Sequence, residues 1–128
     1  MIYLDTSVAL AQILAEDRVP PEALWRETLI SSRLLEYEVW TRIHSWRLTD
    51  SHSDLVRALL GRVAFLELVP PVLARALDAF PTTVRTLDAL HLASMAFLRN
   101  HEQRPFLASY DERLLAAAKA LHFDIHPL

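Results

Sequence analysis

The sequence predicts an α/β protein built on a parallel β-sheet, and two observations lead to this prediction. Short apolar segments rich in strand-forming residues alternate along the 128-residue chain with longer segments of helical character. The first of them, Ile2-Tyr3-Leu4, is apolar throughout, as expected for a strand buried on both faces of a parallel sheet. Strands that alternate with helices are joined by right-handed crossovers. We therefore expect one domain, residues 1–128, long enough to bury a sizeable core.

Capping residues and prolines mark the elements in the first half of the chain. Thr6 and Ser7 can cap a helix directly after the first strand, and Pro20-Pro21 suits the first turn of a second, short helix. Ser31 or Ser32 can cap a long third helix. These signals predict helices at 8–15, from 20 to about 28, from 32 to about 48 and at 51–62, with a strand at 29–31 between the second and third helices.

Proline and threonine mark most boundaries in the second half. Pro70-Pro71 closes a strand, Pro81 breaks the helix that follows, and Thr86 begins the next helix. The signals predict strands at 64–69, 105–110 and 123–125, and helices at 72–80, from 86 to about 100 and at 111–121. No internal repeat, low-complexity segment or linker divides the chain.

The composition bears on location. Hydrophobic residues make up 52% of the chain, yet the longest apolar stretch, 89–98, is too short to span a bilayer and contains His91 and Ser94. The chain opens directly on a strand, with no charged-then-apolar secretion signal. The absence of cysteine excludes disulfides and thiolate metal sites and suits the cytosol. We expect a cytoplasmic protein with no membrane association.

The rarity of glycine excludes several function classes. Gly61 is the only glycine, so the chain has no glycine-rich phosphate loop, no dinucleotide-binding fingerprint and no nucleophile-elbow serine. The net charge of −3 gives no overall basic field for nucleic acid. Every cation except Lys119 is an arginine. This bias suits bidentate contacts with phosphate or carboxylate groups, although a GC-rich genome explains it equally well.

Two acidic residues follow predicted strands. Asp5 ends the first strand, and Asp111 repeats the pattern of an apolar strand, a hydroxyl residue, an acid and then a helix. The carboxyl ends of strands in open α/β sheets are the usual location of ligand sites. If the two strands are neighbours, both acids lie at one edge of the sheet. The alternative for Asp5 is a structural role as a helix cap, for which aspartate is well suited.

Further acids lie on predicted helices. Asp88 is in the first turn of a helix that is apolar on nearly every face, so we expect it to point at protein and to need a partner. Glu36 and Glu38 flank opposite edges of an apolar stripe, and helical periodicity does not choose between them. Glu38 can also form an ordinary surface pair with Arg42. The stripe, which we expect to face inward and to be buried, consists of Leu35, Val39, Ile43 and Trp46.

Taken together, these acids predict an acidic pocket. Two carboxylates about 4 Å apart repel by roughly 4 kcal/mol at an intermediate dielectric, so four of them need a cation. Oxygen ligands without cysteine favour Mg²⁺ or Mn²⁺. Such ions activate water and stabilise leaving oxygens, which makes metal-dependent hydrolysis of a phosphodiester the natural chemistry. We expect the pocket to lack a basic rim and therefore to attract an arginine from a partner.

Four acidic segments of the chain contain these residues. They are Ile-Tyr-Leu-Asp-Thr-Ser at 2–7, Leu-Leu-Glu-Tyr-Glu-Val-Trp-Thr-Arg at 34–42, Thr-Leu-Asp-Ala-Leu-His-Leu-Ala at 86–93 and Phe-Leu-Ala-Ser-Tyr-Asp-Glu-Arg-Leu at 106–114. These segments resemble the four acidic motifs of PIN-domain ribonucleases. The small size and the segment Leu-Asp-Ala-Leu-His-Leu-Ala are similar to the VapC toxins of bacterial toxin–antitoxin pairs. The resemblance covers the whole chain, and the four motifs in this order are fairly specific.

The resemblance implies a PIN-like, three-layer α/β/α fold in which helices sandwich the parallel sheet. It favours Glu38 over Glu36, and it implies that Thr6 and Ser109 support the acids by hydrogen bonds. It also implies an endoribonuclease that acts on RNA, a cognate antitoxin whose tail covers the site, and a homodimer. The residues implied to surround one or two Mg²⁺ (or Mn²⁺) ions are Asp5, Glu38, Asp88 and Asp111.

One departure and four alternatives stand beside this interpretation. Many members of the family carry glycine after the last helix, where this chain has Leu121-His122-Phe123. A haloacid-dehalogenase-type phosphatase needs a second aspartate two residues after the first, where this chain has Ser7. A response-regulator receiver needs an acidic pair at the first strand, where this chain has the single acid Asp5. The remaining alternatives are a catalytically inactive binding module, which the presence of all four acids argues against, and a metal-dependent phosphohydrolase of another family.

Overall fold

The computed structural model describes residues 1–128 and contains one four-stranded parallel sheet in the order β3-β2-β1-β4. Strand β1 is central, with Ile2 beside Leu29 of β2 on one side and beside Phe106 of β4 on the other. The predicted parallel sheet is therefore confirmed. The strands are β1 (Ile2–Leu4), β2 (Leu29–Ser32), β3 (Val63–Leu66) and β4 (Phe106–Ala108).

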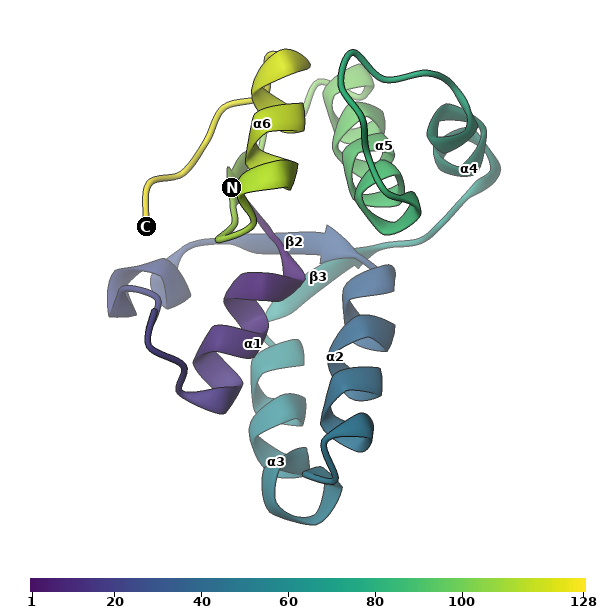
Figure 1. The fold of residues 1–128 in the computed structure, drawn as a ribbon. Helices are drawn as coiled ribbons and strands as arrows, with labels where there is room; N and C mark the ends of the chain where they lie inside the picture. Colours follow the sequence, from purple (N-terminus) through teal and green to yellow (C-terminus); the bar gives the residue numbers. More distant parts are fainter.

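Helices cover both faces of the sheet. Figure 1 shows α1, α2 and α3 on one face and α4, α5 and α6 on the other. This arrangement confirms the predicted three-layer α/β/α fold. The α-helices are α1 (Thr6–Leu14), α2 (Leu34–Ser45), α3 (Thr49–Leu60), α4 (Pro70–Leu77), α5 (Thr86–Asn100) and α6 (Glu112–Ala120), and a 3-10 helix, η1, spans Glu22–Arg26. No helix combines the length and the apolar character that a bilayer-crossing segment requires.

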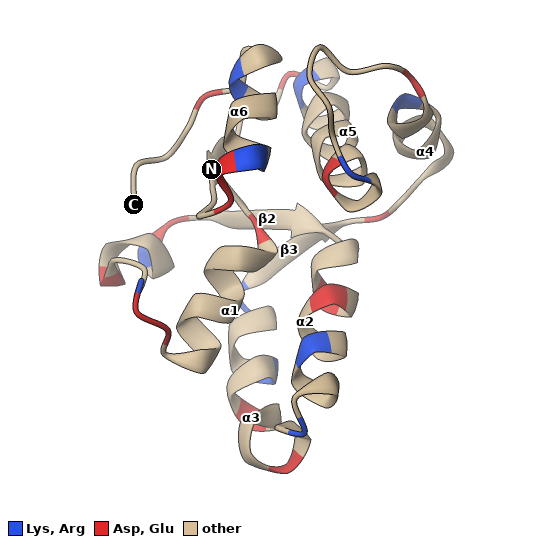
Figure 2. Cartoon of the chain, viewed as in Figure 1, with Lys and Arg blue, Asp and Glu red and all other residues tan.

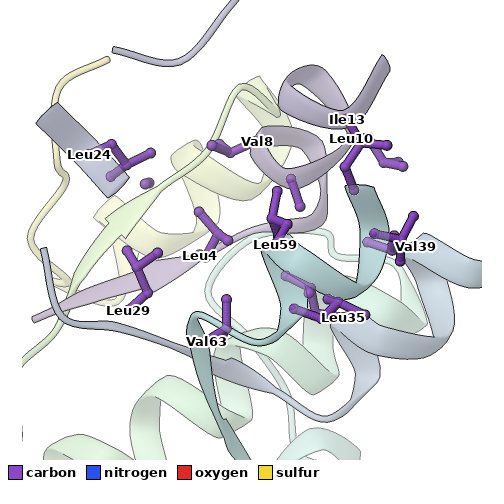
Figure 3. Packing of buried hydrophobic residues seen from close by; sticks show 14 of the residues in the cluster. Leu4, Val8, Leu10, Ile13, Leu24, Leu29, Leu35, Val39, Leu59 and Val63 are labelled. Atoms are coloured by element: carbon purple, nitrogen blue, oxygen red, sulfur yellow. The ribbon is translucent and has the colours of Figure 1, made fainter. Parts of the chain in front are cut away.

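The central strand joins two separate apolar cores. Ile2 and Leu4 pack into the core under α1, α2 and α3, whereas Tyr3 points to the opposite side and joins the core under α5 and α6. Figure 3 shows the first core, with Leu4 among side chains from the three helices that cover it. A one-residue slip of β1 would exchange these faces, so burial on both sides fixes its register. The position of Asp5, directly after β1, is fixed with it.

The long helix predicted from 32 to about 48 ends earlier, at Ser45, and the next helix begins at Thr49. Arg47 between them has a positive φ of 56° and turns the chain. The expectation that Trp46 is buried is wrong, because its side chain is 55% exposed. Trp46 follows the last residue of α2, at the end where α2 and α3 extend away from the sheet (Figure 1).

Three other predicted elements are shorter or of another type. The short helix after Pro20-Pro21 is the 3-10 helix η1, and the strand expected at 123–125 reduces to a single parallel bridge between Ile125 and Leu107. The strand expected at 64–69 ends at Leu66. The turn after α6 contains His122 with a φ of 63°. This left-handed conformation favours glycine, the residue that the family resemblance implies after the last helix, so the departure lies in a turn.

Candidate active site

A cleft of about 1020 Å³ opens at the carboxyl ends of the strands, and all four predicted acids line it. They come from four separate segments: the end of β1, helix α2, helix α5 and the residue before α6. Glu36 does not line the cleft but forms an ion pair with Arg33 at 2.9 Å. The structure thus brings Asp5, Glu38, Asp88 and Asp111 together and leaves Glu36 outside. We call this cavity the acidic cleft.

Asp5 is the N-cap of α1, as the structural alternative predicted. Its Oδ2 accepts hydrogen bonds from the Ser7 hydroxyl at 2.6 Å, the Ser109 hydroxyl at 2.8 Å and the Ser7 backbone N–H at 3.4 Å. Its Oδ1 accepts no hydrogen bond from the protein. Capping therefore occupies one oxygen of Asp5 and leaves the other available, so the cap and ligand roles are compatible.

Asp111 is held in the same way at the start of α6. Its Oδ1 accepts the backbone N–H groups of Arg113 at 2.9 Å and Leu114 at 3.2 Å, as an N-cap does. Its own backbone N–H donates to the Ser109 hydroxyl at 2.9 Å. Because Ser109 also donates to Asp5, one hydroxyl links the two acids that follow strands. Their relative position depends on this serine.

Glu38 is held by side chains rather than by backbone. Its Oε1 accepts the Thr6 hydroxyl at 2.8 Å and lies 2.6 Å from Nε2 of His91. No ion pair joins it to Arg42, the surface partner that helical spacing allowed. His91 was not among the predicted site residues. The sequence feature that could have identified His91 is its polar ring on an otherwise apolar, buried helix, three residues after Asp88.

Asp88 differs from the other three acids because none of the side-chain hydrogen bonds of the structure involves it. Partial burial raises the pKa of its carboxyl, and the negative charges of Asp111 and Asp5 raise that pKa further. The backbone at Arg85 opposes this effect only in part. Burial and two neighbouring carboxylates therefore disfavour ionisation of Asp88.

Asp5, Glu38 and Asp111 share one feature: the protein binds one carboxylate oxygen and leaves the other without a partner. The free oxygens are not sealed from solvent, because the only fully buried side-chain polar atom without a partner is the ring nitrogen of Trp25. Anchored carboxylates with one free oxygen fit a hard cation such as Mg²⁺ or Mn²⁺. As they stand, no three acidic or histidine side chains are grouped tightly enough to hold a metal ion.

The cleft also contains positive charge. Arg18, Arg42 and Arg85 line it, so the prediction of an acidic pocket without a basic rim is wrong. None of the three forms an ion pair, and Arg42 instead lies over the Trp46 ring at 5.2 Å from its centre. Figure 2 shows acidic and basic segments in succession along α2 beside the ends of the strands. These guanidinium groups are free to contact an anion at the edge of the cleft.

The fold and the cleft define a class: three-layer α/β/α domains with a carboxylate cluster at the carboxyl edge of a parallel sheet. Residues 2–120 match the family model described as PIN domain. The chain is 30% identical to Ribonuclease VapC47 of Mycobacterium tuberculosis (strain CDC 1551 / Oshkosh), over 96% of this chain and 93% of that protein. It is 30% identical to Ribonuclease VapC35 of Mycobacterium tuberculosis (strain ATCC 25618 / H37Rv), over 98% of this chain and 95% of that protein.

A solved structure shows the same fold. The crystal structure of Mycobacterium tuberculosis VapC20, described as a sarcin–ricin loop cleaving toxin, superposes with a TM-score of 0.67 over 91% of this chain and 95% of that chain, at 18% identity. At this identity the likeness concerns the fold alone. The family match and the two relatives go further: this chain belongs to the PIN domain family, among the VapC ribonucleases. The resemblance inferred from the four acidic motifs is confirmed.

Proposed function

We propose that this chain is a Mg²⁺- or Mn²⁺-dependent endoribonuclease that hydrolyses RNA phosphodiester bonds. The observation that carries the proposal is the meeting of four carboxylates from four distant segments in one cleft, three of them with one anchored and one free oxygen. Membership among the VapC ribonucleases supports RNA as the substrate and does not favour the inactive module or another phosphohydrolase.

Asp5, Glu38, Asp88 and Asp111 would hold one or two divalent ions in the acidic cleft. A bound ion supplies Lewis-acid activation of the phosphodiester and neutralises charge that develops on its oxygens. The hydrogen bonds from Ser109 and Thr6 keep the carboxylates in place while the charge at the centre of the cleft changes. Support of the acids is the role that the resemblance implied for these two hydroxyl residues.

The three arginines at the edge of the cleft would contact the RNA backbone. They come from different segments, namely the loop after α1, helix α2 and the segment before α5, so together they surround the acids. Phosphate groups on either side of the scissile bond need cations, since the acids at the centre repel them. Arg18, Arg42 and Arg85 carry no competing ion pair and suit this role.

We further propose that the chain is the toxin of a toxin–antitoxin pair and acts in the cytoplasm. The expected antitoxin tail covers the acidic cleft and places an arginine among the carboxylates, where its planar group fits them. The expected homodimer needs an apolar contact surface, and α4 offers one. Leu77 is 89% exposed and Leu73 is 43% exposed, which is unusual for leucines on one short helix.

Cleavage of a single-stranded RNA by the purified chain tests the enzymatic proposal. We expect cleavage with Mg²⁺ or Mn²⁺ and none with a chelator. Asp5→Asn should reduce cleavage to background, because the free oxygen of Asp5 is replaced or loses its charge. The matched control is Asp54→Asn, at a fully exposed acid on α3, which should cleave like the parent. Cleavage by the parent in chelator, or by Asp5→Asn with Mg²⁺, would contradict the proposal.

A further inference from the structure

His91 connects the interior of the protein to the acidic cleft. It lies on α5, is only 2% exposed, and contacts a polar partner at each ring nitrogen. Nε2 is 2.6 Å from Oε1 of Glu38, and Nδ1 is 2.8 Å from the hydroxyl of Tyr3. Tyr3 is fully buried in the central strand. A buried ring held from both sides has one orientation, so the atom that it presents to Glu38 is fixed.

The hydrogen bond that Tyr3 already accepts favours one position for the ring proton of His91. The Tyr3 hydroxyl accepts the backbone N–H of Ser32 at 3.2 Å, which leaves its own proton to be donated. That proton is free to be donated to Nδ1 of His91. The neutral imidazole then carries its hydrogen on Nε2 and donates it to Glu38. A protonated imidazole also has this N–H, so the bond to Glu38 exists in both charge states.

The same oxygen of Glu38 accepts a second bond from Thr6, which belongs to α1. Oε1 is therefore held from α1 and from α5, and neither bond uses Oε2. A glutamate side chain has three rotatable bonds, and ordering it costs conformational entropy. The contacts from His91 and Thr6 order Glu38 before any ligand arrives.

We propose that His91 is a positioning residue that acts through Glu38. The hydrogen bonds that run from Ser32 through Tyr3 to His91 keep a proton on Nε2 of His91. This N–H holds Oε1 of Glu38 and turns Oε2 of Glu38 toward the acidic cleft. The inference rests on the proposed function, because it assigns His91 to the metal-binding carboxylate. Residues that hydrogen-bond a ligating group typically change metal affinity or activity by about 10–100-fold when replaced.

The first test is the tautomer of His91, read from the ring nitrogen shifts of ¹⁵N-labelled parent chain by NMR, in chelator and at a mildly alkaline pH. We expect the tautomer with the proton on Nε2. In Tyr3→Phe, which lacks the hydroxyl that faces Nδ1, we expect this preference to weaken. A parent ring with its proton on Nδ1 would overturn the proposal. This measurement requires neither metal nor catalysis.

The second test is Mn²⁺ affinity, measured by the loss of the free Mn²⁺ signal in electron paramagnetic resonance. His91→Leu removes the donor and should weaken binding by about 10–100-fold. His91→Gln places an amide N–H near the position of Nε2 and should recover most of the affinity. Met95→Leu, at another fully buried position on α5, controls for disturbed packing and should bind like the parent. Equal affinities in the parent and His91→Leu would overturn the proposal.

A double-mutant cycle shows whether His91 acts through Glu38. If it does, adding His91→Leu to Glu38→Gln should weaken Mn²⁺ binding no further than Glu38→Gln alone. Additive losses would mean that His91 acts elsewhere, and the proposal would be wrong while the metal-dependent function stood. A parent chain that binds no Mn²⁺ and cleaves no RNA would instead overturn the proposed function, and this inference with it.

Discussion

The acids that follow strands and the acids on helices reach the same cleft by different means. Asp5 and Asp111 are N-caps, held mainly by amide and hydroxyl groups two or three residues away, with one bond from a distant serine. Glu38 is held by side chains 32 and 53 residues away in sequence, and Asp88 has no side-chain hydrogen bond. The first pair is positioned largely by local backbone geometry, whereas the second depends on tertiary packing.

This difference shows where the electrostatic strain of the site lies. Each capping acid accepts N–H or O–H hydrogen bonds at one carboxylate oxygen. Asp88 has only a backbone hydrogen bond at Arg85, and burial together with the charges of Asp111 and Asp5 raises the pKa of its carboxyl. Mutations at the two kinds of acid should therefore affect activity and stability differently, and this comparison can be tested at each of them.

The largest effect on RNA cleavage is expected from the two glutamates of α2, only one of which lines the acidic cleft. Glu38→Gln should reduce RNA cleavage by more than about 100-fold, beyond the range for residues that only support a ligand. Glu36→Gln is the matched control, because Glu36 pairs with Arg33 outside the cleft, and it should leave the rate nearly unchanged. Single-turnover cleavage rates measure both. If Glu36→Gln lost cleavage while Glu38→Gln retained it, the assignment of Glu38 to the active site would be wrong.

A smaller effect is expected at the serine that links the capping acids. Ser109→Ala removes the donor to Asp5 and the acceptor of the Asp111 N–H. We expect about 10-fold slower cleavage and a free energy of unfolding lower by about 1 kcal/mol, because both partners lose a hydrogen bond. Ser53→Ala removes a helix hydroxyl far from the acids and should leave cleavage unchanged. Denaturant unfolding measures the change in stability, and cleavage assays measure the change in rate. An unchanged cleavage rate in Ser109→Ala would show that activity does not require the hydrogen bonds by which Ser109 links the two capping acids.

The contrast between local and tertiary positioning also explains what could be predicted from the sequence. The parallel sheet, Asp5 and Asp111 were predictable because apolar runs, turn residues and caps are local signals. Periodicity placed Glu36 and Glu38 correctly at opposite edges of the apolar stripe, but only the family resemblance chose between them. The choice depends on which edge meets α1 and α5, and no local signal in α2 contains that information.

The errors have the same origin. Trp46 was expected to be buried because it continues the stripe of α2, and no residue in α2 indicates where the sheet beneath it ends. The arginines of the cleft were missed because Arg18 and Arg85 lie in connecting segments that only the fold brings beside Glu38. His91 was visible as a polar residue on an apolar helix, but its partners, Tyr3 and Glu38, are 88 and 53 residues away.

The smallest effect is a change in melting temperature at Asp88. Its pKa is raised in the folded protein by burial and by the charges of Asp111 and Asp5, so ionisation of its carboxyl destabilises the fold. The cost is absent at low pH, where the carboxyl is protonated in both states, and appears as the pH rises through the folded pKa. Asp88→Asn removes the charge. At pH 7 in chelator it should melt slightly above the parent, on the order of 1–2 °C because the site is partly open to solvent.

Asp5→Asn is the contrasting variant. Repulsion among four carboxylates would by itself make this change stabilising too, but the Asp5 carboxylate accepts three hydrogen bonds, which are stronger to a charged oxygen than to an amide oxygen. Asparagine remains a good cap, so we expect a melting temperature equal to or below that of the parent, by at most about 1 kcal/mol of stability. Mg²⁺ should raise the melting temperature of the parent more than that of either variant, because a ligand stabilises the state that binds it.

The pH dependence checks the effect at Asp88. The gain in melting temperature of Asp88→Asn over the parent should vanish near pH 3, where the Asp88 carboxyl of the parent is protonated. If Asp88→Asn melts below the parent at pH 7 while Asp5→Asn melts above it, the strain lies at the capping acid, and the distinction between the two kinds of acid fails.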